Sequence, residues 1–136
     1  MKAEKIVPTD IVWKLATDVF GERVFRDGQT LVVNGVLSDR RTDGAGVAYL
    51  VKFKPPNGRL LKIIATARSD EHVYLLEGAY CNRAGETIAT PGAYGLNTSG
   101  RRHSAFIGTE TTALVTHRGD PDEVHALEVV EPIAPV

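Results

Sequence analysis

The chain contains 136 residues, with 16 lysines and arginines against 17 aspartates and glutamates, and its formal net charge is -1. This length is typical of one domain with its own core, so we expect residues 1–136 to form a single domain. The basic residues are scattered among acidic ones, which argues against nucleic acid as a partner. The longest apolar runs, such as residues 60–67, are too short to cross a bilayer.

The first five residues, Met1 to Lys5, include two lysines and a glutamate. They lack the apolar core of a secretory signal peptide. We therefore expect a cytoplasmic protein without a membrane partner.

The only segment with a helical pattern is residues 9–20, where Thr9 or Asp10 could cap a short helix. An extended, irregular N-terminal arm is the alternative. Further along, short runs of β-branched and aromatic residues alternate with glycine, asparagine, aspartate and proline. We expect strands at residues 24–25, 29–37, 47–53, 60–68, 72–81, 86–90, 94–97, 104–107 and 111–117.

Strands that follow one another so closely predict an all-β fold, a double-sheet jelly roll whose sheets curl onto each other. We place its core at about residues 20–119. After Gly119 the chain is rich in proline and acidic residues, and we expect this tail either to pack as an extended strand or to fray.

Glycines mark a first motif. Five residues separate Gly58 from Ile64, Thr66 follows after one more, Glu71 after four more, and Gly78 after another six. This spacing resembles the first cupin motif, which reads Gly, five residues, His-x-His, three or four residues, Glu, six residues, Gly. Ile64 and Thr66 stand where that motif has its two histidines.

A second motif runs from Gly92 through Gly100 to His103. It resembles the second cupin motif, Gly, five residues, Pro-x-Gly, two residues, His, with Thr98 in the place of the proline.

The chain is similar to small single-domain cupins of the anti-sigma-factor and acetylacetone-dioxygenase types, which are RmlC-like jelly rolls. The resemblance spans residues 7–119 and is carried by the segments VPTDIVWKL, YLVKFKPPNG, EHVYLLEG and PGAYGLNTSGRRH. It implies a double-stranded β-helix with an extended N-terminal arm.

In such cupins three imidazoles, often with a carboxylate, hold Fe, Mn, Ni, Cu or Zn. Only Glu71 and His103 of that set remain here. Because a catalytic metal usually needs about three protein ligands, we expect no bound metal cofactor. His72 or His117 could complete a ligand set. His72 adjoins Glu71 and should face the other way, whereas the register of His117 cannot be read from the sequence.

Alternation along residues 60–68 places Lys62, Ile64 and Thr66 on one face, and the motif assigns this face to the barrel interior. Lys62 would then point toward the cavity or its mouth, where it could meet an anionic ligand. The opposite face is wholly apolar and needs a cover. A homodimer formed through the sheet would provide one, as would a second sheet or the N-terminal arm.

Glu71 and His103 are therefore the candidate catalytic residues. Facing one cavity, they could share a proton, and an apolar wall that includes Ile64 would raise the pKa of the carboxylate. Such a pair suits cofactor-free acid-base chemistry, an isomerisation or elimination on a small-molecule ligand. Ligand binding without turnover is equally consistent with it. The candidate ligand-binding residues are Lys62, Ile64, Thr66, Val73, Asn97 and His117.

Two other functions stay open, because fold alone does not decide function. One is a metal-dependent enzyme of the cupin dioxygenase type with an atypical ligand set. The other is a non-catalytic structural or interaction domain, whose small barrel is filled by its own side chains, with Ile64 and Val73 as candidates.

Overall fold

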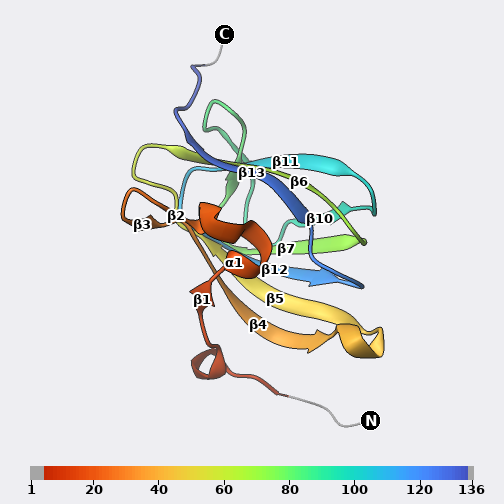
Figure 1. The fold of residues 1–136 in the computed structure, drawn as a ribbon. Coiled ribbons are helices and arrows are strands. Elements are labelled where there is room, and N and C mark those ends of the chain that lie inside the picture. Colours follow the sequence, from red (N-terminus) through yellow and green to blue (C-terminus); the bar gives the residue numbers. More distant parts are fainter. Residues whose placement is uncertain (1–4, 135–136) are drawn as a thin grey trace.

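The computed structural model describes residues 5–134 and consists mainly of two antiparallel β-sheets (Figure 1). The first sheet has the order β1 (Lys14–Leu15), β4 (Val32–Arg40), β5 (Gly46–Phe53), β12 (Thr111–His117), β7 (Glu71–Glu77) and β10 (Tyr94–Asn97). The second has the order β13 (Glu123–Val130), β6 (Leu60–Thr66), β11 (Arg102–Ile107), β8 (Tyr80–Cys81) and β9 (Thr87–Ala89). The prediction of an all-β jelly roll is confirmed.

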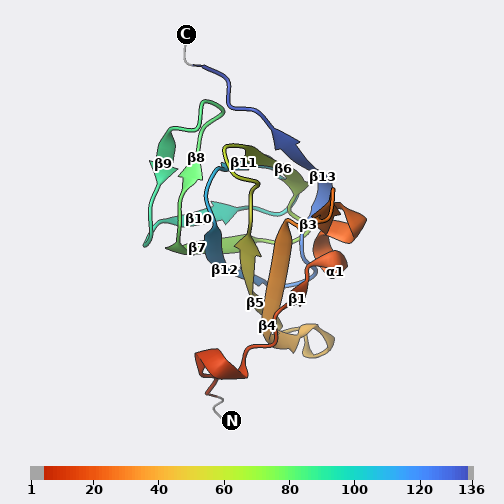
Figure 2. The ribbon, with the colours of Figure 1, turned by 90° about the vertical axis from the view of Figure 1, so that its left-hand side faces the viewer.

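The remaining elements are short. A two-stranded sheet joins β2 (Phe25–Arg26) to β3 (Gln29–Thr30). One α-helical turn, α1 (Thr17–Phe20), lies beside β13 (Figure 2). The 3₁₀ turns are η1 (Pro8–Asp10), η2 (Gly21–Val24) and η3 (Arg41–Asp43). No helix within residues 5–134 is long and apolar enough to cross a membrane.

The N-terminal segment is the extended arm that the resemblance implied, and the alternative of a helix over residues 9–20 holds only for the single turn α1. β1 pairs with β4, so that Lys14 lies opposite Asn34. Ile11 and Trp13 lie directly over Gly35, which has no side chain to displace them. Packing against β4 therefore outweighs the weak helical tendency of this segment.

The strand predicted at residues 72–81 is divided at Gly78. β7 belongs to the first sheet and β8 to the second. Gly78 has a φ of +83°, and a Cβ there would collide with the carbonyl oxygen of Glu110. The chain changes sheets at this glycine because other residues do not fit this combination of dihedral angle and space.

The interior face of β6 is the one that carries the odd-numbered residues. Leu61 and Ile63 belong to the hydrophobic core, and Ala65 is buried with them. The face of β6 that packs into the core is therefore not the predicted one of Lys62, Ile64 and Thr66, although Lys62 and Ile64 still border the cavity. The apolar face that favoured a dimer is the core of the barrel itself, so a homodimer stays a prediction without this support.

The tail after Gly119 does not fray but forms β13, which pairs with β6 and places Leu127 opposite Ile63. The barrel core thus continues well beyond the limit of about residue 119 expected from the sequence. This extension brings the segment just before β13 to the end of the barrel where β7 begins and β12 ends.

Candidate functional site

The barrel contains an open cavity of about 1030 Å³. Its walls are mostly apolar, and they include Phe20, Val51, Phe53, Ile63, Val73 and Val115. One part of the lining is polar and contains Glu71, Asn97, His103 and Asp122. Because a space of this size accommodates a small organic molecule, the alternative that Ile64 and Val73 fill the barrel does not hold.

Glu71 and His117 form one side of the polar region. β7 begins at Glu71, β12 ends at His117, and the two residues are direct partners in the sheet. Their side chains point inward, and the Oε2 atom of Glu71 lies 3.7 Å from Nε2 of His117. The His117 side chain is 0% exposed.

His103 and Asp122 form the other side. His103 lies on β11, and Asp122 immediately precedes β13. Nε2 of His103 donates a hydrogen bond of 2.7 Å to Oδ2 of Asp122, and the same nitrogen lies 3.7 Å from Oε1 of Glu71. Two carboxylates and two imidazoles therefore converge from four separate segments of the chain.

Two further side chains orient this cluster. Nδ2 of Asn97, the partner of Glu71 across β10 and β7, donates a hydrogen bond of 2.9 Å to Oε1 of Glu71. The hydroxyl of Tyr49 on β5 lies 3.2 Å from Nε2 of His117, and the two rings are stacked with centroids 5.8 Å apart. Asn97 thus fixes one carboxylate, and Tyr49 fixes one imidazole.

The burial of Glu71 beside a second carboxylate changes the pKa of Glu71, and the histidines nearby are shifted as well. Burial and the nearby charge of Asp122 raise the pKa of Glu71 to about 7, against the opposing effects of Asn97 and His103. The hydrogen bond to Asp122 raises the pKa of His103, whereas burial lowers the pKa of His117. Two buried carboxylates that lie side by side repel each other, so a proton or a cation between them is favoured.

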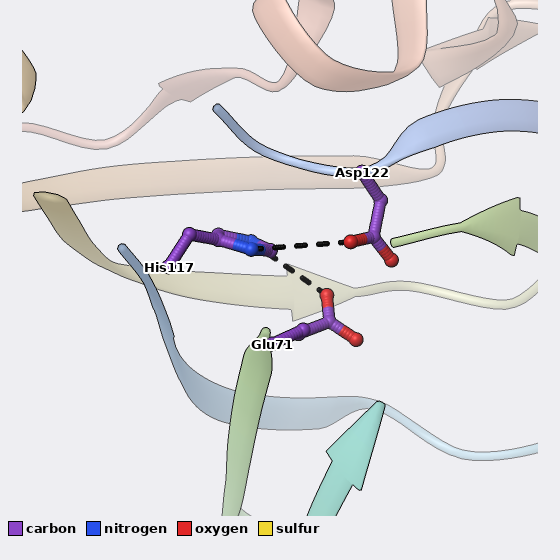
Figure 3. Close-up of side chains that lie close together, drawn as sticks. All are labelled: Glu71, His117 and Asp122. Atoms are coloured by element: carbon purple, nitrogen blue, oxygen red, sulfur yellow. Dashed lines mark ion pairs between the residues drawn. The ribbon is translucent and has the colours of Figure 1, made fainter. Parts of the chain in front are cut away.

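Two atoms of the cluster have no hydrogen-bond partner among the described residues. They are Nδ1 of His117 and Oδ1 of Asp122, which are both buried and lie 3.9 Å apart. Figure 3 shows the side chains of His117, Asp122 and Glu71 converging from separate segments. A buried polar atom without a partner costs about 1–3 kcal/mol, so such atoms usually contact water or an ion. This pair marks the place where a bound species would be stabilised.

The cluster fits a divalent cation. Glu71, His117 and Asp122 can each offer one ligand atom within 4.8 Å of the other two. A metal bound at about 2.0–2.2 Å brings its donors to about 3–3.5 Å from one another, so small movements would complete the site. Imidazole and carboxylate donors together suit Mn, Fe or Zn. The expectation of no metal counted only Glu71 and His103, and it did not include Asp122.

A second alignment of the histidine positions falls on alanines that face the interior, at the cost of six rather than five residues after Gly58. If three residues, rather than four, separate His-x-His from Glu71, the two positions are Ala65 and Ala67, which are 2% and 1% exposed. Ala65 lies opposite His103 across β6 and β11. The donors of the cluster are therefore supplied by neighbouring strands, next to the positions where the motif has its histidines.

The other predicted site residues lie partly on the inner and partly on the outer faces of the two sheets. Thr66 contacts Nε2 of His125 at 2.7 Å on the outer face of the second sheet. Lys62 and Ile64 border the cavity, but they alternate with the core residues of β6 and share the face of Thr66. Val73 lines the cavity. His72 is exposed, and its Nδ1 atom lies 2.7 Å from the hydroxyl of Tyr94.

The sequence of this chain matches no protein-family model and no curated protein. Solved structures do match. An acetylacetone dioxygenase from Acinetobacter johnsonii superposes with a TM-score of 0.59 at 17% identity, over 96% of this chain and 86% of that chain. An RmlC-like cupin from Ralstonia eutropha JMP134 gives 0.57 at 16%, over 95% and 80%. The Fe(II) form of HppE gives 0.55 at 12%, over 85% and 60%.

At these identities the comparisons establish the fold. The chain has a single-domain cupin fold, as the spacing of its glycines predicted. It differs from the motif in having no histidine at residues 64–67 and in having a buried aspartate, Asp122, in the site.

Proposed function

We propose that this protein is a metal-dependent cupin enzyme that takes an apolar small molecule into its barrel. Its ligands are Glu71, His117 and Asp122, and His103 is a fourth donor once its Nε2 proton has left. The observation that carries the proposal is the pair of buried, unpartnered atoms on His117 and Asp122. Each of them has a lone pair that a cation can accept.

The bound cation would supply a Lewis acid that polarises an oxygen of the substrate. The protein provides the rest of the site. Asn97 holds Glu71 in place, and Tyr49 contacts Nε2 of His117, which leaves Nδ1 free. The apolar walls exclude water from the substrate and strengthen electrostatic interactions in the cavity. A dioxygenase and an Fe(II) protein of the same fold support a metal function.

Calorimetric titration of tag-free, metal-free protein with Mn(II), Zn(II) and anaerobic Fe(II) tests the proposal. We expect one site per chain, and we expect Asp122→Asn and His117→Ala each to weaken it at least about 100-fold, more than the loss of a typical supporting residue. His72→Ala and His125→Ala are matched controls, because both histidines lie outside the cluster. A site that tolerates Asp122→Asn, or that disappears in a control, contradicts this assignment.

The hydrogen bond of 2.7 Å between His103 and Asp122 favours a second function, cofactor-free acid-base catalysis. In that case His103 moves a proton to and from a substrate in the cavity, and Asp122 orients the imidazole and stabilises its charged form. Turnover that survives a chelator but is lost in His103→Ala would favour this function. Turnover that needs an added divalent ion would exclude it.

A further inference from the structure

Arg101 lies at the rim of the cavity, two residues before His103. Its backbone carbonyl accepts a hydrogen bond from the amide of Ala67, which continues the pairing of β11 with β6. Residues two apart in a strand share a face, so Arg101 lies on the same side of β11 as His103. Arg102, opposite Thr66, belongs to the outer face.

Arg101 is exposed, and its guanidinium forms neither an ion pair nor a side-chain hydrogen bond with any residue between 5 and 134. Arg83 and Arg102 also line the cavity and form no ion pair among the described residues, whereas several arginines elsewhere are paired. Arg41 binds both Asp39 and Asp120, and Arg59 binds Glu131. Arg101 is nevertheless close enough to the cluster that its positive charge opposes the rise in the pKa of His103. A free cation therefore stands at the entrance to the cavity.

The charges of the cavity impose an orientation on an anionic ligand. Glu71 and Asp122 repel an anion from the polar cluster in the absence of a metal, whereas Arg101 attracts one at the rim. Arg101 and the polar cluster lie near the same end of the barrel, and the walls beyond them are apolar, with side chains such as Phe53 and Ile63. Guanidinium binds carboxylate, sulfonate and phosphate groups through charge-assisted hydrogen bonds.

We propose that the ligand of this cavity is an apolar molecule that carries one anionic group, and that Arg101 binds this group at the rim. The apolar body then extends into the barrel, and the anionic group stays at the rim beside His103. The inference rests on the proposed function only for the chemistry at the polar cluster. The binding of the anionic group by Arg101 does not depend on a metal.

Two fluorescent probes with the same ring system test the inference. Anilinonaphthalene sulfonate carries one negative charge, and N-phenylnaphthylamine carries none. We expect the wild-type protein to bind the sulfonate about three- to tenfold more tightly than the neutral probe, as one partly exposed charged contact allows. Arg101→Gln should remove this preference and leave the affinity for the neutral probe unchanged. Arg101→Lys should retain part of it.

Arg26→Gln and Arg68→Gln are the matched controls. Arg26 on β2 and Arg68 just after β6 are both exposed, and neither lines the cavity. Both controls change the net charge as Arg101→Gln does, and both should keep the preference for the sulfonate. Equal affinities of the wild-type protein for the two probes would overturn the inference, and so would loss of the preference in either control.

The same titrations in EDTA and after loading with Zn(II) separate this inference from the proposed function. A preference that depends on Arg101 in a protein that binds no metal supports the inference and contradicts the metal function. Stoichiometric metal binding without any preference for the anionic probe supports the metal function and overturns the inference.

Discussion

Nδ1 of His117 and Oδ1 of Asp122 lie 3.9 Å apart inside the barrel, and neither has a hydrogen-bond partner among the described residues. His117 ends β12 and Asp122 precedes β13, so the four residues between them form the connection that brings both to the cluster. The two atoms are positioned for a shared ligand rather than for each other, because 3.9 Å is too long for a hydrogen bond.

Tyr49→Phe tests whether the orientation of His117 matters for metal binding. The variant keeps the stacked ring but removes the hydroxyl that contacts Nε2 of His117 at 3.2 Å. We expect the affinity for Mn(II) or Zn(II) to fall about 10- to 100-fold, the usual effect of removing a partner of a metal-ligating histidine. Tyr80→Phe is the control, since Tyr80 also lines the cavity but has no hydrogen bond to His117. An unchanged affinity in Tyr49→Phe would show that the contact is only structural.

Glu71 gives the metal-free protein a specific dependence of stability on pH. Its pKa is raised from 4.5 to about 7, so folding favours the protonated carboxyl. This stabilisation is fully present below pH 4.5 and is lost as the pH rises through 7. The shift corresponds to at most ~3 kcal/mol.

Urea unfolding of wild type and Glu71→Gln in EDTA, between pH 4 and pH 8.5, measures this effect. Because glutamine is neutral throughout, the wild-type protein should lose stability relative to the variant as the pH rises. The opposite slope, with the wild-type protein gaining relative stability toward high pH, would mean that Glu71 is stabilised as an anion in the folded protein.

Gly78→Ala should destabilise the fold by more than Gly58→Ala. Both glycines have positive φ, +83° and +78°, so an alanine costs about 1–2 kcal/mol at either position. At Gly78 the new Cβ also meets the backbone of Glu110 and Thr111, whereas nothing lies within 4 Å at Gly58. Denaturant unfolding measures the difference, and equal losses for the two variants would contradict the packing described at the change of sheets.

Much of the fold is predictable from the sequence. The spacing from Gly58 to Gly78 and from Gly92 to His103 reflects turns that require glycine, and it indicated the jelly roll without any pairing information. The interior face of β6 was not predicted correctly, because a shift of one residue in the motif exchanges the two faces of a strand. Choosing four rather than three residues before Glu71 therefore placed Ile64 and Thr66, instead of Ala65 and Ala67, in the barrel.

The candidate site is only partly predictable. Glu71 and His103 were found from the motif, Asn97 from its place near His103, and His117 as a histidine at a strand end whose register was left open. Asp122 was missed because it lies in the tail, and its place in the site depends on the pairing of β13 with β6. The available signal was the apolar pattern of Val124, Leu127 and Val129, which predicts a strand but not its partner.

Elemental analysis of tag-free protein, before and after incubation with Fe(II), Mn(II) and Zn(II) and removal of excess ion, decides whether the cluster of Glu71, His117 and Asp122 holds a metal. We predict close to one metal ion per chain in the wild-type protein and far less in Asp122→Asn, with His125→Ala unchanged. A wild-type protein that retains no metal under any of these conditions would contradict this prediction.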